Sequence, residues 1–339
     1  MGLRRLTERV RSRRRFSRPN GENMAKHILR TGFGWILAAT ILGTASGIST
    51  GVEETSGNPI LPDFYADPTA REFEGRFWIY PSHDLPDSTY WDMVDWHVFS
   101  SDNLVQWHDH GVIFSLDDIS WADRWAWAPD CIERKGKYYF YFPADMQIGV
   151  AVGPSPTGPF SDALGRPLIG RGEAETTVID PAVFIDDDGQ AYLYFGNGNA
   201  ESLRVVRLKE DMITRDGPIL KVPAENFHEA AWMHKYEGRY YLSYCSLEGT
   251  GPEGELKSRI AYSIGESPLG PFQYQGSILD NGSRNNHHSI VKFGNQWYIF
   301  YHVQGPSWYE RRVCAEFLEY DENGKILPVK MTKTGIRLR

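Results

Sequence analysis

The chain has 339 residues, of which 24% are charged and 41% are hydrophobic, and its formal net charge is −8 at pH 7. This composition is typical of a globular protein and excludes an intrinsically disordered one. Residues 1–30 hold ten Lys or Arg and two Asp or Glu, so the rest of the chain carries −16. Because nucleic-acid binding relies on Lys and Arg to neutralise phosphates, so acidic a body argues against a nucleic-acid partner.

Residues 1–50 are predicted to be a basic N-terminal extension and a signal peptide. Residues 24–30 form a short basic region, 33–42 an apolar core, and 44–47 a run of small residues where a signal peptidase could cut. The apolar core is shorter than the roughly 20 residues that span a bilayer. Residues 12–16 resemble a twin-arginine signal but lie far from that core. We therefore expect export to the periplasm or the exterior, with no stable membrane span in the mature protein.

The chain then repeats one local pattern five times. Each copy is a turn glycine, a polar residue and an aromatic-rich run, which is typical of a hairpin entering its second strand. The five copies are 75–80, 136–141, 189–194, 238–243 and 294–300, with glycines 61, 53, 49 and 56 residues apart. A period near 50 residues without long amphipathic helices indicates blades of about four strands. We predict an all-β, five-bladed β-propeller over residues 51–339.

An ionisable side chain precedes the turn of every blade. These residues are Asp67, Asp130, Asp180, Glu229 and His287. Each lies on or beside the strand before the hairpin turn, which in a propeller is the innermost strand around the axis. Carboxylates that converge there repel one another, so their pKa values move apart. Acid–base chemistry on a glycosidic oxygen needs this separation, with one carboxyl protonated and another ionised.

The segments around four of these ionisable residues resemble glycoside hydrolase family 43. They are 58–68, 127–130, 179–189 and 229–235, and the likeness continues in order from about residue 58 to 339. Members of that family are five-bladed propellers that hydrolyse with inversion, mostly as β-xylosidases, α-L-arabinofuranosidases and arabinanases. The resemblance implies that Asp67 is the general base, Glu229 the general acid, and Asp180 the carboxylate that orients the acid and raises its pKa.

Further site residues follow from the resemblance and from their position. Trp121, Trp125 and Trp127 crowd the second blade, and at least one of them is expected to form a stacking wall for a sugar ring. His83 could reach a sugar hydroxyl. Arg312, with Arg311 as second choice, matches an arginine beside the acid cluster.

His287 matches the family's axial histidine, which in many members coordinates calcium or another ion directly or through water. A hydrogen-bonded channel histidine without any ion is the alternative, since calcium prefers oxygen ligands. No cofactor is expected to be required. One structural Ca²⁺ in the axial channel remains an alternative.

The expected function is inverting hydrolysis of terminal xylose or arabinofuranose linkages in plant polysaccharides or their oligosaccharides. Two alternatives remain at this point: the same machinery acting on galactofuranosides or galactosides, and a propeller that binds glycan without cutting it. The expected partner is an oligo- or polysaccharide, and the protein is expected to be a monomer or a weak oligomer.

Overall fold

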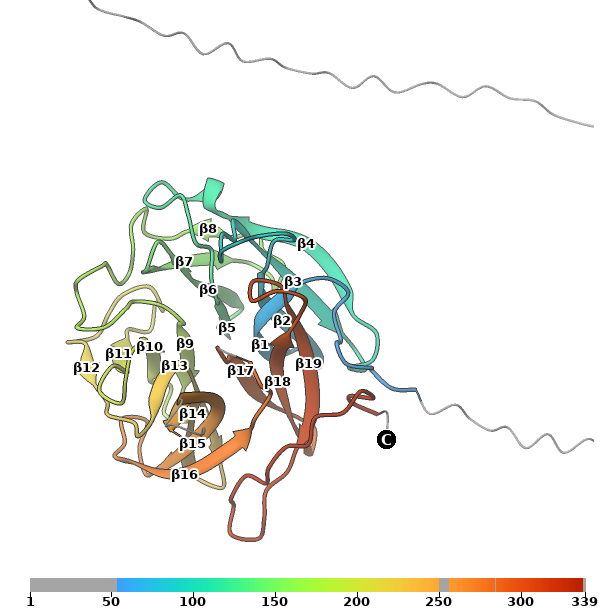
Figure 1. The fold of residues 1–339 in the computed structure, drawn as a ribbon. Coiled ribbons are helices and arrows are strands. Elements are labelled where there is room, and N and C mark those ends of the chain that lie inside the picture. Colours follow the sequence, from blue (N-terminus) through green and yellow to red (C-terminus); the bar gives the residue numbers. More distant parts are fainter. Residues whose placement is uncertain (1–53, 250–255, 284, 338–339) are drawn as a thin grey trace, which may run out of the picture. The chain divides into compact units, whose positions relative to one another are not determined.

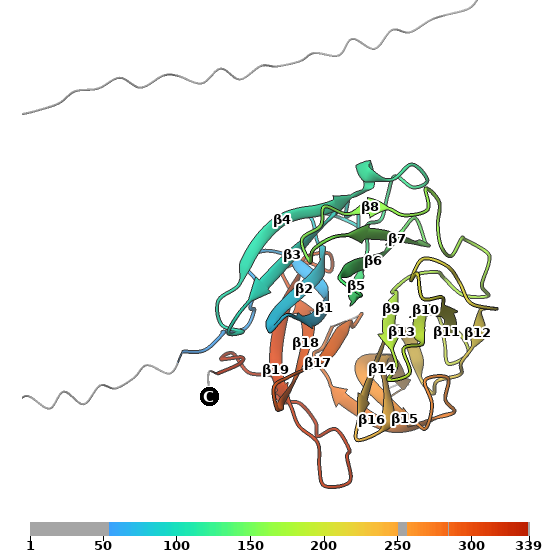
Figure 2. The same ribbon diagram turned by 180° about the vertical axis from the view of Figure 1, so that it is seen from behind.

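The computed structural model describes residues 54–249, 256–283 and 285–337, so the N-terminal extension and signal peptide predicted above lie outside the described residues. The described strands form five antiparallel sheets around a central axis (Figures 1 and 2). The fold is thus the predicted five-bladed β-propeller, and it lies within the compact unit Val52–Arg339.

Each blade is described from its innermost strand outward. The first contains β1 (Tyr65–Phe73), β2 (Arg76–His83), β3 (Asp95–Ser101) and β4 (His108–Ser115). The second contains β5 (Asp130–Arg134), β6 (Lys137–Ala144), β7 (Gln147–Gly153) and β8 (Ser161–Asp162). The third contains β9 (Ala182–Ile185), β10 (Ala191–Phe195), β11 (Arg204–Leu208) and β12 (Leu220–Lys221).

The fourth blade contains β13 (Phe227–Tyr236), β14 (Arg239–Gly249), β15 (Leu256–Gly265) and β16 (Phe272–Leu279). The fifth has three strands, β17 (His288–Phe293), β18 (Gln296–Gln304) and β19 (Arg311–Leu318). A short 3₁₀ helix, η1 (Leu116–Asp118), follows β4. None of the described residues belongs to a helix long and apolar enough to cross a bilayer.

The repeated turn glycines lie between the first and second strands of their blades, as predicted. At Glu74–Gly75, which joins β1 to β2, both residues have positive φ, 56° and 77°. Such a two-residue turn has a twist that matches the right-handed twist of the strands it joins, and glycine takes positive φ without steric cost. The aromatic run after each turn forms the second strand of its blade.

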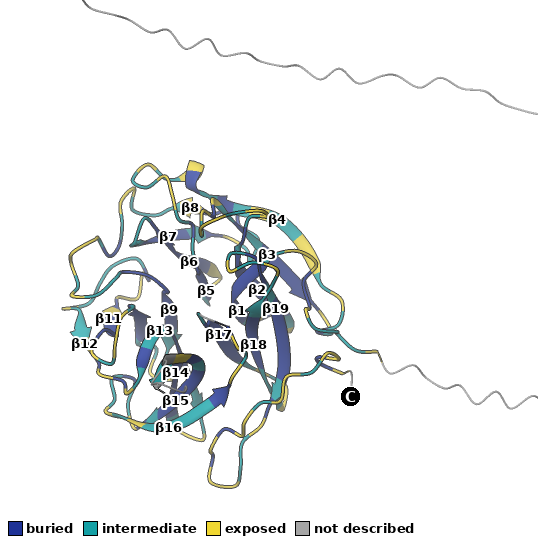
Figure 3. Cartoon of the chain, viewed as in Figure 1, coloured by how far each residue is buried: buried dark blue, intermediate teal, exposed yellow. Residues whose placement is uncertain are grey.

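Many strand residues are buried (Figure 3), and the hydrophobic core lies between neighbouring blades. Phe77 of β2 and Phe300 of β18 pack together between the first and fifth blades, while Trp96 and Phe140 pack together between the first and second. All four side chains are 1% exposed or less. Burial of such a side chain contributes about 1.5–3 kcal/mol, so the aromatic repeats hold each blade against the next.

The two ends of the described chain close the ring on the fifth blade. The backbone N–H of Ile60 donates to Val313 of β19, and that of Ser56 donates to Ile336. The Asn58 side chain adds two bonds to the backbone of Ala315, accepting from its N–H at 2.9 Å and donating to its carbonyl at 3.2 Å. We call the segment 55–60 with its partners on and after β19 the clasp.

Candidate active site

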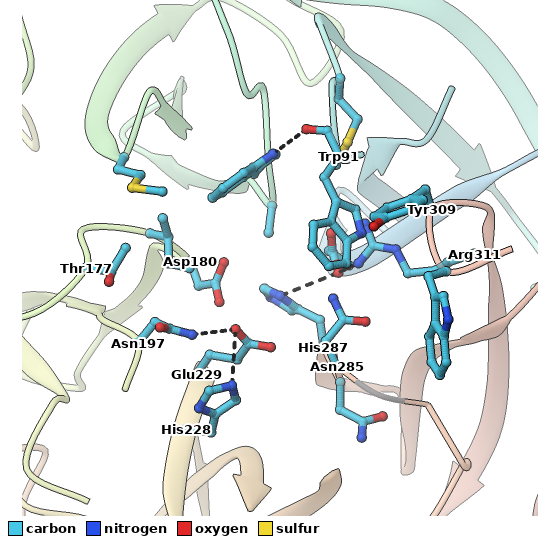
Figure 4. A pocket seen from close by; sticks show the side chains of 18 of the residues that line it. Trp91, Thr177, Asp180, Asn197, His228, Glu229, Asn285, His287, Tyr309 and Arg311 are labelled. Atoms are coloured by element: carbon cyan, nitrogen blue, oxygen red, sulfur yellow. Dashed lines mark hydrogen bonds and ion pairs between the residues drawn. The ribbon is translucent and has the colours of Figure 1, made fainter. Parts of the chain in front are cut away.

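A cavity of about 410 Å³ lies where the innermost strands of the blades converge (Figure 4). Several residues that the sequence singled out line it, together with others that it did not. The predicted ones are Asp67, Asp180, Glu229, His287 and Trp127, and Arg311, the second choice for the arginine, joins them. The cavity therefore takes its acidic groups from three different blades.

Asp67 lies near the start of β1, at an irregularity in the pairing of that strand with β2. Its φ is +50°, a left-handed conformation that few non-glycine residues adopt but that Asp tolerates. Bulges of this kind re-aim a side chain. The Asp67 carboxylate, in a residue 6% exposed, accepts hydrogen bonds from Ser82 Oγ at 2.6 Å and from Arg311 Nη1 at 2.7 Å.

The electrostatics of Asp67 favour its ionised form. Burial alone would raise the pKa of this carboxyl, but the Arg311 guanidinium and the His302 and His287 imidazoles together outweigh burial and lower the pKa well below its usual range. His302 fixes the backbone here, since its Nδ1 accepts the Asp67 N–H at 3.2 Å and its Nε2 donates to the carbonyl of Asn285. Asp67 is thus an ionised acceptor held in one orientation.

Arg311 rather than Arg312 is the arginine of the acid cluster, which corrects the first choice made from the sequence. Arg311 is 2% exposed, and its Nε and Nη2 donate to the buried carboxylate of Asp84 at 2.9 and 2.8 Å. Arg312 follows it on β19 and points to the opposite face, where its guanidinium lies 5.0 Å from the centre of the Phe64 ring. Successive side chains on a strand alternate between faces, so only one of the two could reach the cavity.

Glu229 lies on β13, and the register of that strand shifts on both sides of it. Its carboxylate accepts a hydrogen bond from Asn197 Nδ2 at 2.7 Å and lies 4.0 Å from His228 Nε2. The side chain is 14% exposed, so it remains open to the cavity. Burial raises the pKa of Glu229 above its usual value, even though His228 and Asn197 act in the opposite direction.

Asp180 precedes β9 and, like Asp67, has a positive φ, +56°. Its carboxylate accepts the N–H of Ala230, the residue after Glu229, at 3.1 Å. Burial raises the pKa of Asp180 strongly, and the nearby charges of Glu229 and Asp67 raise it further. Because the repulsion between Asp180 and Glu229 is mutual, the two carboxyls titrate as a pair that keeps a proton to higher pH than either would alone.

His287 lies in the cavity 3.9 Å from Asp67, measured from Nδ1 to Oδ1, and is 7% exposed. Burial lowers the pKa of His287 to about 4, so its imidazole is neutral at neutral pH. The protein donors here do not match those of a calcium site, which takes 6–8 oxygen ligands. The nearby carboxylate of Asp67 already accepts hydrogen bonds from Arg311 and Ser82.

Aromatic side chains from three loops form one wall of the cavity. Trp127 donates its Nε1–H to the carbonyl of Trp91 at 2.8 Å, which fixes the plane of its ring. Trp91 meets Tyr309 edge to face at 4.8 Å between ring centroids, and Tyr90 and Trp308 complete the wall. Four of these five rings were missed by the sequence, because they belong to loops without a repeated pattern.

Three other predicted binding residues lie outside the cavity lining. Trp125 stacks behind Trp127 at 5.4 Å between ring centroids. Trp121 stacks on Phe142 and donates to Asp162, so its ring belongs to the packing between blades.

His83 pairs with Asp95 on the first blade, away from the acid cluster. Asp130 is fully buried and pairs with Arg71, so the expectation that every blade supplies an ionisable group to the channel fails at the second blade.

The arrangement supports paired acid–base chemistry. One carboxyl, Asp67, has its pKa lowered by the neighbouring guanidinium and imidazoles, while a second, Glu229, has its pKa raised by burial. They lie on the first and fourth blades, which the fifth blade separates, and they share no hydrogen-bond partner among those described. A water and a sugar ring between them would meet a base on one side and an acid on the other.

Comparisons with known proteins point to one family. The model of the family described as "Glycosyl hydrolases family 43" matches residues 56–326. A xylosidase/arabinosidase of Bacteroides ovatus is 36% identical, over 79% of this chain and 95% of its own. A β-xylosidase/α-arabinofuranosidase from a compost metagenome, solved with xylotriose in a calcium-free form, has a TM-score of 0.71 at 34% identity, over 81% of this chain and 97% of its own.

Two further relatives add a bound sugar and a different named activity. A Xanthomonas citri enzyme solved with xylose has a TM-score of 0.71 at 35% identity, over 81% of this chain and 93% of its own. A β-D-galactofuranosidase of Aspergillus niger is 34% identical, over 84% of this chain and 88% of its own.

Fold and site together define a β-propeller glycoside hydrolase, with its acids carried on separate blades. The chain belongs to glycoside hydrolase family 43.

Proposed function

We propose that the protein is an inverting glycosidase that releases terminal xylose or arabinofuranose from plant polysaccharides or their oligosaccharides. The observation that carries this proposal is the opposite electrostatic environment of Asp67 and Glu229 within one cavity. The named activities of the relatives, xylosidase and arabinosidase, support a pentose as the sugar released.

In this proposal Asp67 is the general base and Glu229 is the general acid. Ionised Asp67 takes a proton from a water molecule as the water attacks the anomeric carbon from one face of the sugar. Glu229 gives its proton to the glycosidic oxygen as that bond breaks on the other face. Asp180 acts through Glu229, since the two carboxyls titrate as a pair that keeps a proton to higher pH, and its bond to Ala230 N–H holds the adjacent backbone. Each proton transfer of this kind contributes about 10²–10⁴-fold to the rate.

The aromatic wall supports a role in holding the sugar. Trp127 is the ring whose plane is fixed by a hydrogen bond and backed by Trp125, so we propose that it stacks against the pentose. Aromatic faces suit the apolar C–H face of a sugar, while Asn197, His228 and Arg311 supply polar groups around it.

The roles of the two acids can be separated by the leaving group. We compare Asp67→Asn and Glu229→Gln on xylobiose, whose leaving sugar needs a proton, and on a 2,4-dinitrophenyl xyloside, whose phenolate does not. Asp67→Asn should lose about 10²–10⁴-fold in kcat on both substrates, whereas Glu229→Gln should lose that much on xylobiose alone.

Asp102→Asn, at an exposed carboxylate that pairs with Arg76, is the matched control and should behave as the unmodified enzyme. Full activity of Asp67→Asn or of Glu229→Gln on xylobiose would refute the proposal. NMR of the first product should show the inverted anomer, and retention would refute inversion.

Galactofuranose is the second candidate for the released sugar. It is favoured by the Aspergillus niger relative, whose name is β-D-galactofuranosidase. Parallel assays with 4-nitrophenyl β-D-xylopyranoside, α-L-arabinofuranoside, β-D-galactofuranoside and β-D-galactopyranoside decide between the two. The sugar with the highest kcat/KM identifies the natural class.

We propose that hydrolysis needs no cofactor, and that a calcium ion near His287 could only be structural and water-ligated. One relative was solved in a form called calcium-free, which is why calcium is the ion to test. Activity should survive exhaustive dialysis against a calcium chelator. A loss that Ca²⁺ alone restores would overturn this proposal.

We also propose that the enzyme is exported through its N-terminal signal peptide and acts as a monomer or weak oligomer. The support is the basic, apolar and small-residue order of 24–47 in the sequence. Cell fractionation of the full chain and light scattering of the purified protein test the two statements. Retention of an uncleaved protein in the cytosol, or a stable tetramer, would contradict them.

A further inference from the structure

A second cluster of ionisable side chains lies on the first blade, outside the cavity. His83 ends β2, and Asp95 and His97 begin β3. Each offers one ligand atom, and the three atoms lie within 4.8 Å of one another. It is the one group of this kind within residues 54–249, 256–283 and 285–337. None of the three residues has a role in the proposed hydrolysis.

The blade holds these side chains in place. His83 Nδ1 lies 2.7 Å from Asp95 Oδ1, and the His83 ring stacks on the buried ring of Tyr65 at 5.0 Å between centroids. His97 Nδ1 lies 3.1 Å from Asp109 Oδ1. A carboxylate against a ring nitrogen orients an imidazole and increases its basicity as a metal ligand. The arrangement is therefore partly organised by the fold.

The cluster is also reachable and negatively charged. The side chains of His83, Asp95 and His97 are 24%, 20% and 13% exposed, so an ion can enter from solvent. Within the described residues, the ion pairs of Asp95 and Asp109 are with these two imidazoles and not with Lys or Arg.

We propose that His83, Asp95 and His97 form a binding site for a divalent transition metal, with Zn²⁺ as the best match. Two imidazoles and one carboxylate are ligands that Zn²⁺ takes, whereas Ca²⁺ and Mg²⁺ prefer shells made of oxygen. Three protein ligands leave a fourth position for water, and Asp109 supports His97 from the edge of the cluster.

The position of this zinc site gives it a structural role. Its ligands join the ends of β2 and β3, and Tyr65 of β1 packs against them. His83 is followed by Asp84, whose carboxylate holds Arg311, and Tyr65 lies two residues before Asp67. A bound ion would therefore tie β2 to β3, against the packed ring of Tyr65 on β1, at the end of the blade that carries the ionised carboxylate.

Zinc titration of the purified protein, without a polyhistidine tag and stripped of metal by a chelator, tests the site. We expect about one equivalent of Zn²⁺ to bind in the micromolar range, and the melting temperature to rise with zinc. Co²⁺ in its place should give the intense visible bands of tetrahedral cobalt. An excess of Ca²⁺ should not compete.

Variants locate the site. Affinity should fall more than about 100-fold in His97→Gln and in Asp95→Asn, and about 10–100-fold in Asp109→Asn. The matched control is His108→Gln, an exposed histidine of the same blade, which should bind zinc as the unmodified protein does. Circular dichroism and zinc-free melting temperatures check that each variant is folded.

Three results would overturn the proposal. They are no binding at 1 mM Zn²⁺ (roughly a thousandfold above the expected range), equal loss of affinity in His108→Gln, and unchanged affinity in folded His97→Gln and Asp95→Asn. The cobalt spectrum of the unmodified protein decides the case if the variants prove unstable, because octahedral rather than tetrahedral bands would refute a site built from these ligands.

Discussion

At the scale of single residues, the site depends on a chain of three charges. Asp84 holds Arg311, and Arg311 holds Asp67, so the position and ionisation of the last group depend on the first two. Both ends are buried carboxylates, and the guanidinium between them has its own pKa raised by Asp67 and Asp84 in spite of burial. The neighbouring carboxylates thus favour the charged form of the arginine.

Removal of this charge should move the acid limb of the pH profile. In Arg311→Gln the pKa of Asp67 is no longer held down, so it rises, by about 1–3 units for a carboxyl that loses an adjacent arginine. The acid limb of kcat/KM on xylobiose then moves to higher pH by the same amount.

Arg312→Gln on the other face of β19 is the control and should leave the limb where it is. If Asp84, now unpaired, destabilises the variant, Arg311→Gln combined with Asp84→Asn removes both charges. An unmoved acid limb in a folded variant would contradict the role given to Arg311.

The alkaline limb should move the other way when Asp180 loses its charge. Asp180→Asn removes the repulsion that favours protonated Glu229, so the pKa of Glu229 falls. We expect the alkaline limb of kcat/KM to shift to lower pH, together with a lower kcat at neutral pH. A shift to higher pH, measured over the same buffers, would show that Asp180 acts on Glu229 in some other way.

At the scale of secondary-structure elements, irregular strands place the acids. β1 is interrupted at Asp67 and β13 on both sides of Glu229, while Asp180 takes a left-handed conformation just before β9. Bulges and strained backbone occur near functional sites because they turn a side chain out of the regular alternation. The innermost strands are thus regular where they pack and irregular where they face the cavity.

One ion pair joins three of these strands. Arg71 of β1 donates to both oxygens of the fully buried Asp130 of β5, and also to the carbonyl of Val183 on β9. Asp130 in turn accepts the Val183 N–H at 2.6 Å.

Arg71→Met should destabilise the protein by about 3–5 kcal/mol, because it leaves the Asp130 carboxylate buried without its charged partner. Urea denaturation measures this change. Arg76→Met on the same blade, whose pair with Asp102 is exposed, should cost less than about 1 kcal/mol. Similar losses in the two variants would show that burial does not set the strength of the pair.

Much of the fold could be predicted from the sequence, because the turn glycines and aromatic runs repeat once per blade. Asp67 and Glu229 stood out for the same reason: each precedes a repeat. The choice between Arg311 and Arg312 could not be made, since β19 is buried on both faces and its hydrophobic pattern does not mark the inner one. The aromatic wall could not be predicted either. Its rings come from loops that carry no repeated sequence pattern, and only the three-dimensional paths of these loops bring the rings together.

At the scale of the whole molecule, the clasp closes the ring. The Asn58 side chain bonds to Ala315 and to Glu316, which also accepts from Thr332. These contacts join residues more than 250 positions apart in the chain, so they constrain the ring as no local turn can.

Asn58→Ala should lower the free energy of unfolding by about 1–3 kcal/mol. The backbone of Ala315 and the carboxylate of Glu316 would lose the hydrogen bonds that the Asn58 side chain makes to them. Chemical denaturation followed by tryptophan fluorescence measures the loss. Asn323→Ala, at an exposed turn, is the control, and an equal loss there would argue against a special role for the clasp.

Because the acids are divided among blades, catalysis depends on the alignment of the blades in the closed ring. Blade one supplies Asp67, blade four supplies Glu229, and Asp180 stands ahead of the first strand of blade three, so no single blade can hydrolyse anything. During heating, a small gap between the first and fifth blades would spoil their alignment while every sheet stayed intact. The enzyme should therefore lose activity at a lower temperature than that at which spectroscopy detects melting. The difference between these two temperatures would measure how far the ring can open before its blades come apart.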